Sequence, residues 1–250
     1  MTEIFVDHDL MRTIIRAMIK AIEVDVPNYR QMLDLTSDNY IRVIRGDAIS
    51  TNLENMVASE SVMVHRFDRN AFHCRMVIDR KNKITYTITT EQNLCNIPKK
   101  KDRKRPHFLQ SILAMENGDV QGEYIQQVLF PMGQFEEEEL KNDYDKIVEG
   151  IIESEEYHHY VISYTYSGNE LVDVNLNYLD KGFNFVSKAS LNEYIKPDFA
   201  KLTDPIPEAE EATEKSAKSA RSLVSLKKGI QPVAVDVQLK KMEDEHQGLK

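Results

Sequence analysis

Residues 72–89 carry apolar side chains at every second position on both sides of a short polar turn, residues 80–83. The alternating apolar residues are Phe72, Cys74, Met76 and Ile78 before the turn, and Ile84, Tyr86 and Ile88 after it. Successive side chains of a β-strand point to opposite faces of a sheet, so this period of two predicts a β-hairpin. The fold must therefore contain antiparallel sheet.

The same alternation returns in residues 162–178, around a turn at residues 167–170. It predicts a second hairpin, which a turn at residues 180–182 follows. The other predicted strands are residues 61–67, residues 183–186 and residues 40–44, the last of which is expected to end at Arg45-Gly46-Asp47.

Apolar residues elsewhere recur at spacings of three and four, which is typical of amphipathic helices. The predicted helices are residues 8–24, 28–35, 48–58 and 137–154, while residues 108–115 are apolar and fit either a strand or a helix. Helices combined with hairpins predict an α+β fold with a largely antiparallel sheet built from two hairpins. The sequence lacks regular βα alternation, GxGxxG and GxxxxGK[ST], which argues against a doubly wound nucleotide-binding fold.

Composition changes after Phe199, because no aromatic residue follows it. Residues 204–220 consist mainly of Ala, Glu, Lys, Ser and Pro, which bury too little apolar surface to offset the ordering entropy. We therefore predict one domain, residues 1–203, and a flexible, largely disordered tail, residues 204–250. The tail has 8 Lys+Arg and 9 Asp+Glu, a net charge of −1, so the domain carries −8 of the total of −9.

The chain has no apolar run long enough to cross a bilayer, and its first residues do not resemble a secretory signal. Its two cysteines, Cys74 and Cys95, are too few for a disulfide framework or a four-cysteine zinc site. These features exclude a membrane-spanning protein, a disulfide scaffold and a zinc finger, and they favour a cytoplasmic protein without membrane contacts.

Six basic residues occupy seven consecutive positions of this acidic chain. They are Lys99, Lys100, Lys101, Arg103, Lys104 and Arg105. A cluster of this kind attracts phosphate backbones, which favours binding of RNA or DNA. The alternatives are a solvated loop, or a loop that pairs with the acidic run of residues 136–139 within the same molecule.

Asp47, Asp79 and His107 are the candidate catalytic residues. Carboxylates can hold a divalent cation and a lysine such as Lys81 can stabilise negative charge, which is the combination found in metal-dependent nucleases. The simpler alternatives are that Asp47 caps a helix and that Asp79 and Lys81 shape a turn. No residue spacing indicates a bound metal, and the sequence identifies no cofactor.

Two aromatic pairs, Tyr164/Tyr166 and Tyr157/Tyr160, could stack on bases, although packing within a sheet explains them more simply. Gly46 permits a tight turn or the close approach of a ligand. His158 and His159 are adjacent in an expected strand, so their side chains should point to opposite faces.

Several segments resemble a family of uncharacterised bacterial proteins, a domain of unknown function found mainly in Gram-positive bacteria and mobile elements. The segments are Arg45-Gly46-Asp47 and residues 78–87, 106–112 and 196–199. The resemblance covers about residues 8–203 and leaves out the tail. It implies a bacterial, cytoplasmic protein with a role in a toxin–antitoxin pair or in phage defence.

Three functions follow as expectations. The first is a toxin or effector whose basic loop, residues 99–105, binds RNA or DNA and whose protein partner is an antitoxin or regulator. The second is a non-enzymatic adaptor or subunit that docks a partner protein through its tail or its basic loop. The third, weaker, is a metal-dependent nuclease that uses Asp47 and Asp79.

Overall fold

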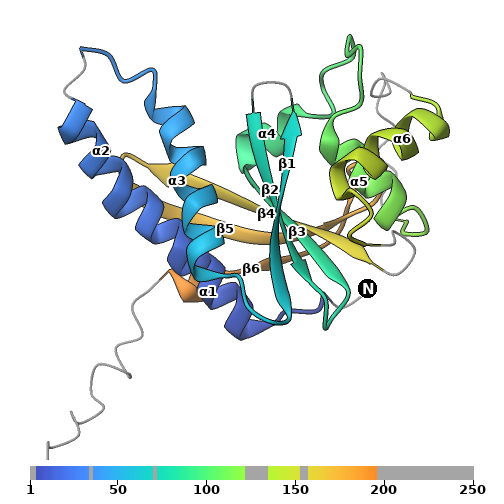
Figure 1. Cartoon of the computed structure of the whole chain (residues 1–250), viewed down its shortest axis with the longest axis horizontal. Coiled ribbons are helices and arrows are strands. Elements are labelled where there is room, and N and C mark those ends of the chain that lie inside the picture. The colour runs from blue at the N-terminus through green and yellow to red at the C-terminus, as the bar shows by residue number, and fades with distance from the viewer. Residues whose placement is uncertain (1–3, 34–35, 70–71, 122–134, 153–156, 196–250) are drawn as a thin grey trace, which may run out of the picture. The chain divides into compact units, whose positions relative to one another are not determined.

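The computed structural model describes residues 4–33, 36–69, 72–121, 135–152 and 157–195, and its fold is α+β, as predicted (Figure 1). A six-stranded sheet has the order β1-β2-β3-β4-β5-β6. The strands are β1 (Val62–Arg69), β2 (Phe72–Asp79), β3 (Ile84–Thr90), β4 (His158–Ser167), β5 (Glu170–Leu179) and β6 (Phe185–Ser190). The expected tail, residues 204–250, lies outside the described residues. Among the helices of the described part, none has the length and apolar character needed to span a bilayer.

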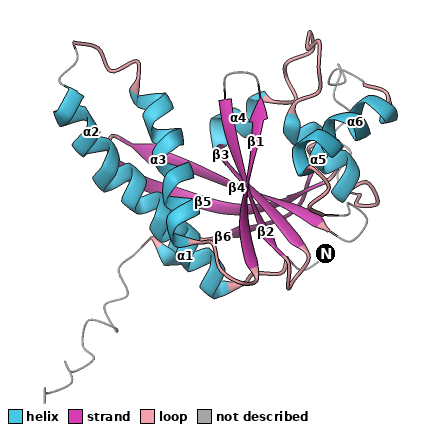
Figure 2. Ribbon diagram, viewed as in Figure 1, coloured by secondary structure: helices cyan, strands magenta, loops and turns pink. Residues whose placement is uncertain are grey.

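Both predicted hairpins are confirmed, as β2–β3 and β4–β5, and the sheet is antiparallel except between β3 and β4 (Figure 2). The parallel register pairs Ile84 with His158 and Thr90 with Tyr164. Parallel neighbours require a crossover connection. Here the crossover carries α4 (Glu91–Asn96), α5 (Phe108–Glu116) and α6 (Glu137–Val148). The carboxyl ends of β3 and β4 consequently lie at the same edge of the sheet.

Different helices cover the two faces of the sheet, as two neighbouring residues of β4 show. Ile162 packs with α1 (His8–Ile19), the π-helical turn η1 (Lys20–Asp25) and α3 (Ile41–Met56). Val161, whose side chain points the other way, packs with α4 and α5. The inner strand β3 is therefore buried on both faces, including its threonines Thr85 and Thr87.

The predicted helix 8–24 corresponds to α1 and η1, which continue directly into α2 (Val26–Leu33). Residues 108–115, for which the sequence left both possibilities open, form a helix. Its first turn is fixed by a capping box in which His107 accepts from the backbone and the Gln110 side chain accepts from the His107 amide.

The predicted strand at residues 40–44 is wrong, and so is the predicted break at Arg45-Gly46-Asp47. Both segments belong to α3, and Gly46 and Asp47 lie on its exposed side. The buried side of α3 consists of Arg45, Ala48, Ile49, Asn52 and Leu53, at spacings of three and four. Arg45 is polar although it is buried, so the apolar pattern alone did not reveal the first half of the helix.

Candidate anion-binding site

The sheet divides at one end of β2. This strand pairs with β1 along its whole length, from Phe72 to Asp79, but it pairs with β3 only from Met76 to Asp79. Residues 72–75 therefore diverge from β3, and β3 has no partner in β2 at Ile88–Thr90. The separation opens the sheet beside the carboxyl ends of β3 and β4, below the first half of α3.

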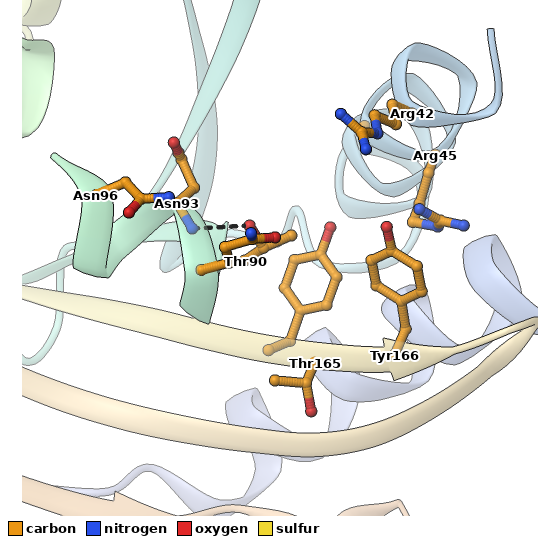
Figure 3. A pocket seen from close by; sticks show the side chains of 10 residues that line it. Arg42, Arg45, Thr90, Asn93, Asn96, Thr165 and Tyr166 are labelled. Atoms are coloured by element: carbon orange, nitrogen blue, oxygen red, sulfur yellow. Dashed lines mark hydrogen bonds between the residues drawn. The ribbon is translucent and has the colours of Figure 1, made fainter. Parts of the chain in front are cut away.

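Two adjoining cavities occupy this opening. The larger has a volume of about 710 Å³ and lies between α3, α4 and the ends of β3 and β4. The smaller, of about 480 Å³, extends toward residues 72–75 and shares Arg42, Gly46, Asn93 and Tyr164 with the larger. We call the larger cavity the α3–α4 cleft. The side chains that shape it are Arg42, Arg45, Asn93, Asn96, Tyr164 and Tyr166 (Figure 3).

The lining of the α3–α4 cleft is positively charged. Arg42 and Arg45 line it from α3, and Asn93 and Asn96 line it from α4 on the opposite side (Figure 3). The other lining residues are neutral, so the described lining contains two arginines and no carboxylate. On a chain with a net charge of −9, such a cavity is a local region of positive potential.

Arg45 is the most unusual of these residues, because its side chain is charged and yet only 6% exposed. Its guanidinium carbon lies 3.5 Å from the centre of the Tyr166 ring, which is a close cation–π contact. Its Nε atom is buried without a hydrogen-bond partner, and no described carboxylate pairs with it. A cation–π contact contributes about 2 kcal/mol when desolvated, whereas a buried charge without a counterion costs several kcal/mol. The charge of Arg45 is thus only partly compensated by the protein.

The remaining side chains of the cleft offer neutral hydrogen-bonding groups. Thr90 caps α4 by accepting from the Asn93 amide at 3.2 Å, and the Asn93 side chain donates to Thr89 Oγ1 at 2.9 Å. Burial raises the pKa of Tyr164 to about 12, although the charge of Arg45 opposes the rise. The Tyr164 hydroxyl therefore keeps its proton at neutral pH and remains a hydrogen-bond donor. This tyrosine is buried, as the packing interpretation of the sequence expected.

The basic run follows α4 directly. Lys99, Lys100, Lys104 and Arg105 are exposed, and no carboxylate of the described residues lies within ion-pair distance of them. Lys101 is exposed as well. Arg103 differs, because it is half-buried, burial lowers its pKa, and it donates to the Ile97 carbonyl at 3.2 Å. Arg103 thus shapes the loop, and the other cations face solvent.

The acidic run, residues 136–139, begins α6 and does not pair with Lys99, Lys100, Lys104 or Arg105. Glu136 and Glu139 form the capping box of α6, and Glu137 and Glu138 occupy its first turn. Carboxylates at this position interact favourably with the helix dipole.

Asp79 lies where the sequence placed it, at the end of a strand, and it shapes the following turn. Its Oδ1 accepts from the amides of Lys81 at 3.0 Å and Asn82 at 3.1 Å, and its Oδ2 accepts from the Asn82 side chain at 2.6 Å. Asp79 is 2% exposed, so these bonds satisfy a buried carboxylate. The turn interpretation of Asp79 is thereby confirmed.

Asp47 does not join Asp79, and the prediction that it caps a helix is wrong. It lies on the exposed side of α3 and lines the smaller cavity beside Phe72 and His73, at the opposite end of β2 from Asp79. Seven residue steps along a strand separate those ends by roughly 20 Å. No group of three or more His, Cys, Asp or Glu that could hold a metal occurs among the residues of known position. The geometry gives the nuclease hypothesis no shared site for the two carboxylates.

His107 has a structural role as well. Its Nδ1 accepts from the Leu109 amide at 3.2 Å. Burial, together with the charges of Arg103, Arg69 and Lys100, lowers the pKa of His107 to about 3. His107 is therefore neutral at physiological pH, and its Nδ1 is unprotonated in order to accept this bond.

The sequence did not reveal a buried polar cluster beneath α5. Glu116 accepts a hydrogen bond from the Tyr144 hydroxyl at 2.8 Å and contacts the Thr85 hydroxyl. The same Thr85 hydroxyl lies 2.6 Å from His159 Nδ1, and Thr87 Oγ1 lies 2.8 Å from His159 Nε2. His159 is fully buried and His158 is exposed, so the expectation that they point to opposite faces is confirmed. The only indication of this cluster in the sequence was the alternation of threonines along β3.

A family of unknown function (DUF5986) matches residues 4–238 of the chain. The chain belongs to this family. The DUF5986 match begins close to the predicted start at residue 8 but extends past residue 203, so the resemblance was too short at its carboxyl end. Neither a curated protein nor a solved structure matches the chain.

The residues of the α3–α4 cleft were only partly visible in this DUF5986 sequence. Gly46 and the pair Tyr164/Tyr166 were candidates, but Arg42 and Arg45 were assigned to a strand and its turn. Asn93 and Asn96 had no sequence signal at all. The cleft combines three segments that are distant along the chain, and they are brought together by the parallel pairing of β3 with β4 and by the packing of α3 on the sheet.

Proposed function

We propose that this DUF5986 protein binds a nucleic-acid strand, RNA or DNA, through the basic loop 99–105. The observation that carries the proposal is the exposure of Lys99, Lys100, Lys104 and Arg105 without described carboxylate partners on an acidic chain. Cations that the protein does not neutralise are available to displace counterions from phosphates.

The test compares two variants with the same change of charge. In the loop variant, Lys99, Lys100, Lys104 and Arg105 are replaced by Ser, and Arg103 is kept because it supports the loop. In the control, Arg16, Lys141, Lys146 and Lys181, which are also exposed, are replaced by Ser. Binding of fluorescent single-stranded RNA and DNA is measured by anisotropy over a salt series.

We expect the loop variant to bind at least about tenfold more weakly than the wild type. The slope of log K against log[salt] should fall by about 3, since each lost phosphate contact removes about 0.7 for a single strand. The control should keep most of the slope. Equal losses in both variants would show attraction by overall charge alone, and the proposal would then be wrong.

We further propose a biological setting, which the resemblance to bacterial proteins supports. The protein would act in the bacterial cytoplasm as the toxin or effector of a toxin–antitoxin or phage-defence module, and an acidic partner protein would cover the loop. Induced expression of the wild type, the loop variant and the control in a bacterial host tests this proposal. Growth inhibition should disappear only in the loop variant, and inhibition that persists there would reject a role of the loop.

An adaptor function remains a second candidate, because the DUF5986 match continues to residue 238 and so includes most of the expected tail. A family-wide segment in this position is consistent with docking of a partner protein. Deletion from Asp204 onward separates the two functions. An adaptor should lose a co-purifying partner while the remaining chain keeps its circular dichroism spectrum and its RNA binding.

A further inference from the structure

We propose that the α3–α4 cleft binds the phosphate group of a phosphorylated ligand of nucleotide size, with Arg42 and Arg45 as the residues that hold the phosphate. The juxtaposition of a buried, unpaired Arg45 with an open, carboxylate-free cavity carries this inference. The proposal concerns a different site from the basic loop and does not depend on it.

Arg45 is arranged as a ligand-binding arginine rather than as a structural one. Structural arginines that are buried pair with a carboxylate or donate to carbonyl oxygens. Arg69 shows the ordinary case in this molecule, because it pairs with Asp143 and donates to the Pro106 carbonyl at 3.5 Å. Arg45 has neither kind of partner within the described residues. Its one strong contact is with the face of the Tyr166 ring, and such stacking leaves the N–H groups at the guanidinium edge available.

Arg42 supplies a second positive charge from the same side of the cleft. It precedes Arg45 by three residues in α3, so the two side chains lie on neighbouring turns of one helix surface. Arg42 is exposed and has no described ion-pair partner. Two guanidinium groups match the charge and the oxygen geometry of a phosphate better than those of a single carboxylate.

The rest of the cleft fits the body of such a ligand. A volume of about 710 Å³ lies within the range of small-molecule sites. Asn93 and Asn96 face the arginines across the cavity and offer both donors and acceptors, as the hydroxyls or ring nitrogens of a nucleotide require (Figure 3). The absence of a carboxylate from the described lining disfavours a cationic ligand.

Two sources could supply the phosphate: a free mononucleotide, or the phosphorylated end of a nucleic-acid strand. The probes that distinguish them are inorganic phosphate, adenosine monophosphate, and a short RNA with and without a 5′-phosphate. Thermal unfolding and calorimetric titration of the full chain give the readouts. Strand binding is measured in the loop variant, so that the basic loop does not contribute.

The wild type should be stabilised by adenosine monophosphate, or the loop variant should bind the 5′-phosphorylated RNA at least about tenfold more tightly than the dephosphorylated RNA. R42Q tests the site without a change in the core, because Arg42 is exposed, and it should weaken binding by about tenfold. R45K keeps the charge but loses the planar fork, and it should weaken binding further. R16Q, at an exposed position of α1, is the matched control and should bind as the wild type does.

Saturable binding that R42Q and R45K weaken, and R16Q does not, supports the proposal. No saturable binding of any phosphate probe, or equal binding by R42Q and the wild type, overturns it. If the wild type binds RNA through the loop while every phosphate probe fails at the cleft, this inference fails and the proposed function stands. If phosphate binds at the cleft while the loop variant binds dephosphorylated strands as tightly as the wild type does, this inference stands and the proposed function fails.

Discussion

Single buried residues determine how the stability of this protein depends on pH. Burial raises the pKa of Glu116 from 4.5 to about 7, although hydrogen bonds with Thr85 and Tyr144 oppose the rise. Burial lowers the pKa of His159 from 6.5 to about 3. The contribution of Glu116 to the free energy of unfolding is fully present below pH 4.5 and is lost as the pH rises through 7. The contribution of His159 has the opposite sign: it is full above pH 6.5 and is lost as the pH falls through 3.

Replacing Glu116 by Gln should remove the pH-dependent contribution of Glu116 to stability. The amide cannot ionise, so E116Q should lack the loss of stability that the wild type suffers on going from pH 5 to pH 8. We expect the difference in unfolding free energy between wild type and E116Q to change by about 2 kcal/mol over this range. Urea unfolding at both pH values measures it. Glu60→Gln, at an exposed position, is the control and should show no such change.

Secondary-structure elements could be predicted from the sequence where one local pattern decides them. The hairpins β2–β3 and β4–β5 follow from alternation around a turn, and α1 follows from its apolar stripe. The first half of α3 could not be predicted, because Arg45 occupies a buried position that the apolar pattern treats as exposed. In the second half, Asn52 is a buried polar residue as well. Asn52 is buried because its side chain donates to Asp25 at 2.7 Å and to the Ala17 carbonyl. Such long-range partners are not visible in a local pattern.

Two glycines test the backbone of these elements as a matched pair, because a Cβ atom at either position would meet nothing within 4 Å. Gly46 lies inside α3, where Ala is the better helix former, so Gly46→Ala should stabilise the protein by up to about 1 kcal/mol. Gly150 follows α6 with a φ of +73°, which L residues rarely adopt, so Gly150→Ala should destabilise it by about 1 kcal/mol. Thermal unfolding gives the signs, and two shifts of the same sign would contradict this description of α3.

The whole molecule depends on one pairing that no local pattern predicts, the parallel alignment of β3 with β4. It joins the two hairpins into one sheet and places both central strands under helices on each face. The same pairing brings the ends of β3 and β4 together beside α3, which creates the candidate site. The sequence therefore predicted neither the candidate site nor the order of the strands, because both depend on contacts between residues far apart in the chain.

Hydrogen exchange should show that different parts of the sheet are protected to different degrees. Amides of Val161–Ser163 in β4 lie in a strand that is paired on both sides and covered on both faces, so they should exchange most slowly. Amides of His73–Arg75 lie beyond the point where β2 leaves β3, so they should exchange faster by at least about tenfold. Mass spectrometry of peptides from the two segments measures the difference. Equal protection would contradict the division of the sheet at Met76.

The crossover between β3 and β4 has a consequence for how this family can vary. It leaves the sheet at Thr90 and returns next to the same strand at His158, so the length and content of the excursion do not alter the strand register. Both the amide side of the cleft and the cationic loop are encoded within that single excursion. Changes confined to that one contiguous stretch therefore alter the amide side of the cleft and the cationic loop without altering the pairing of β3 with β4, whereas Arg42 and Arg45 are encoded outside it.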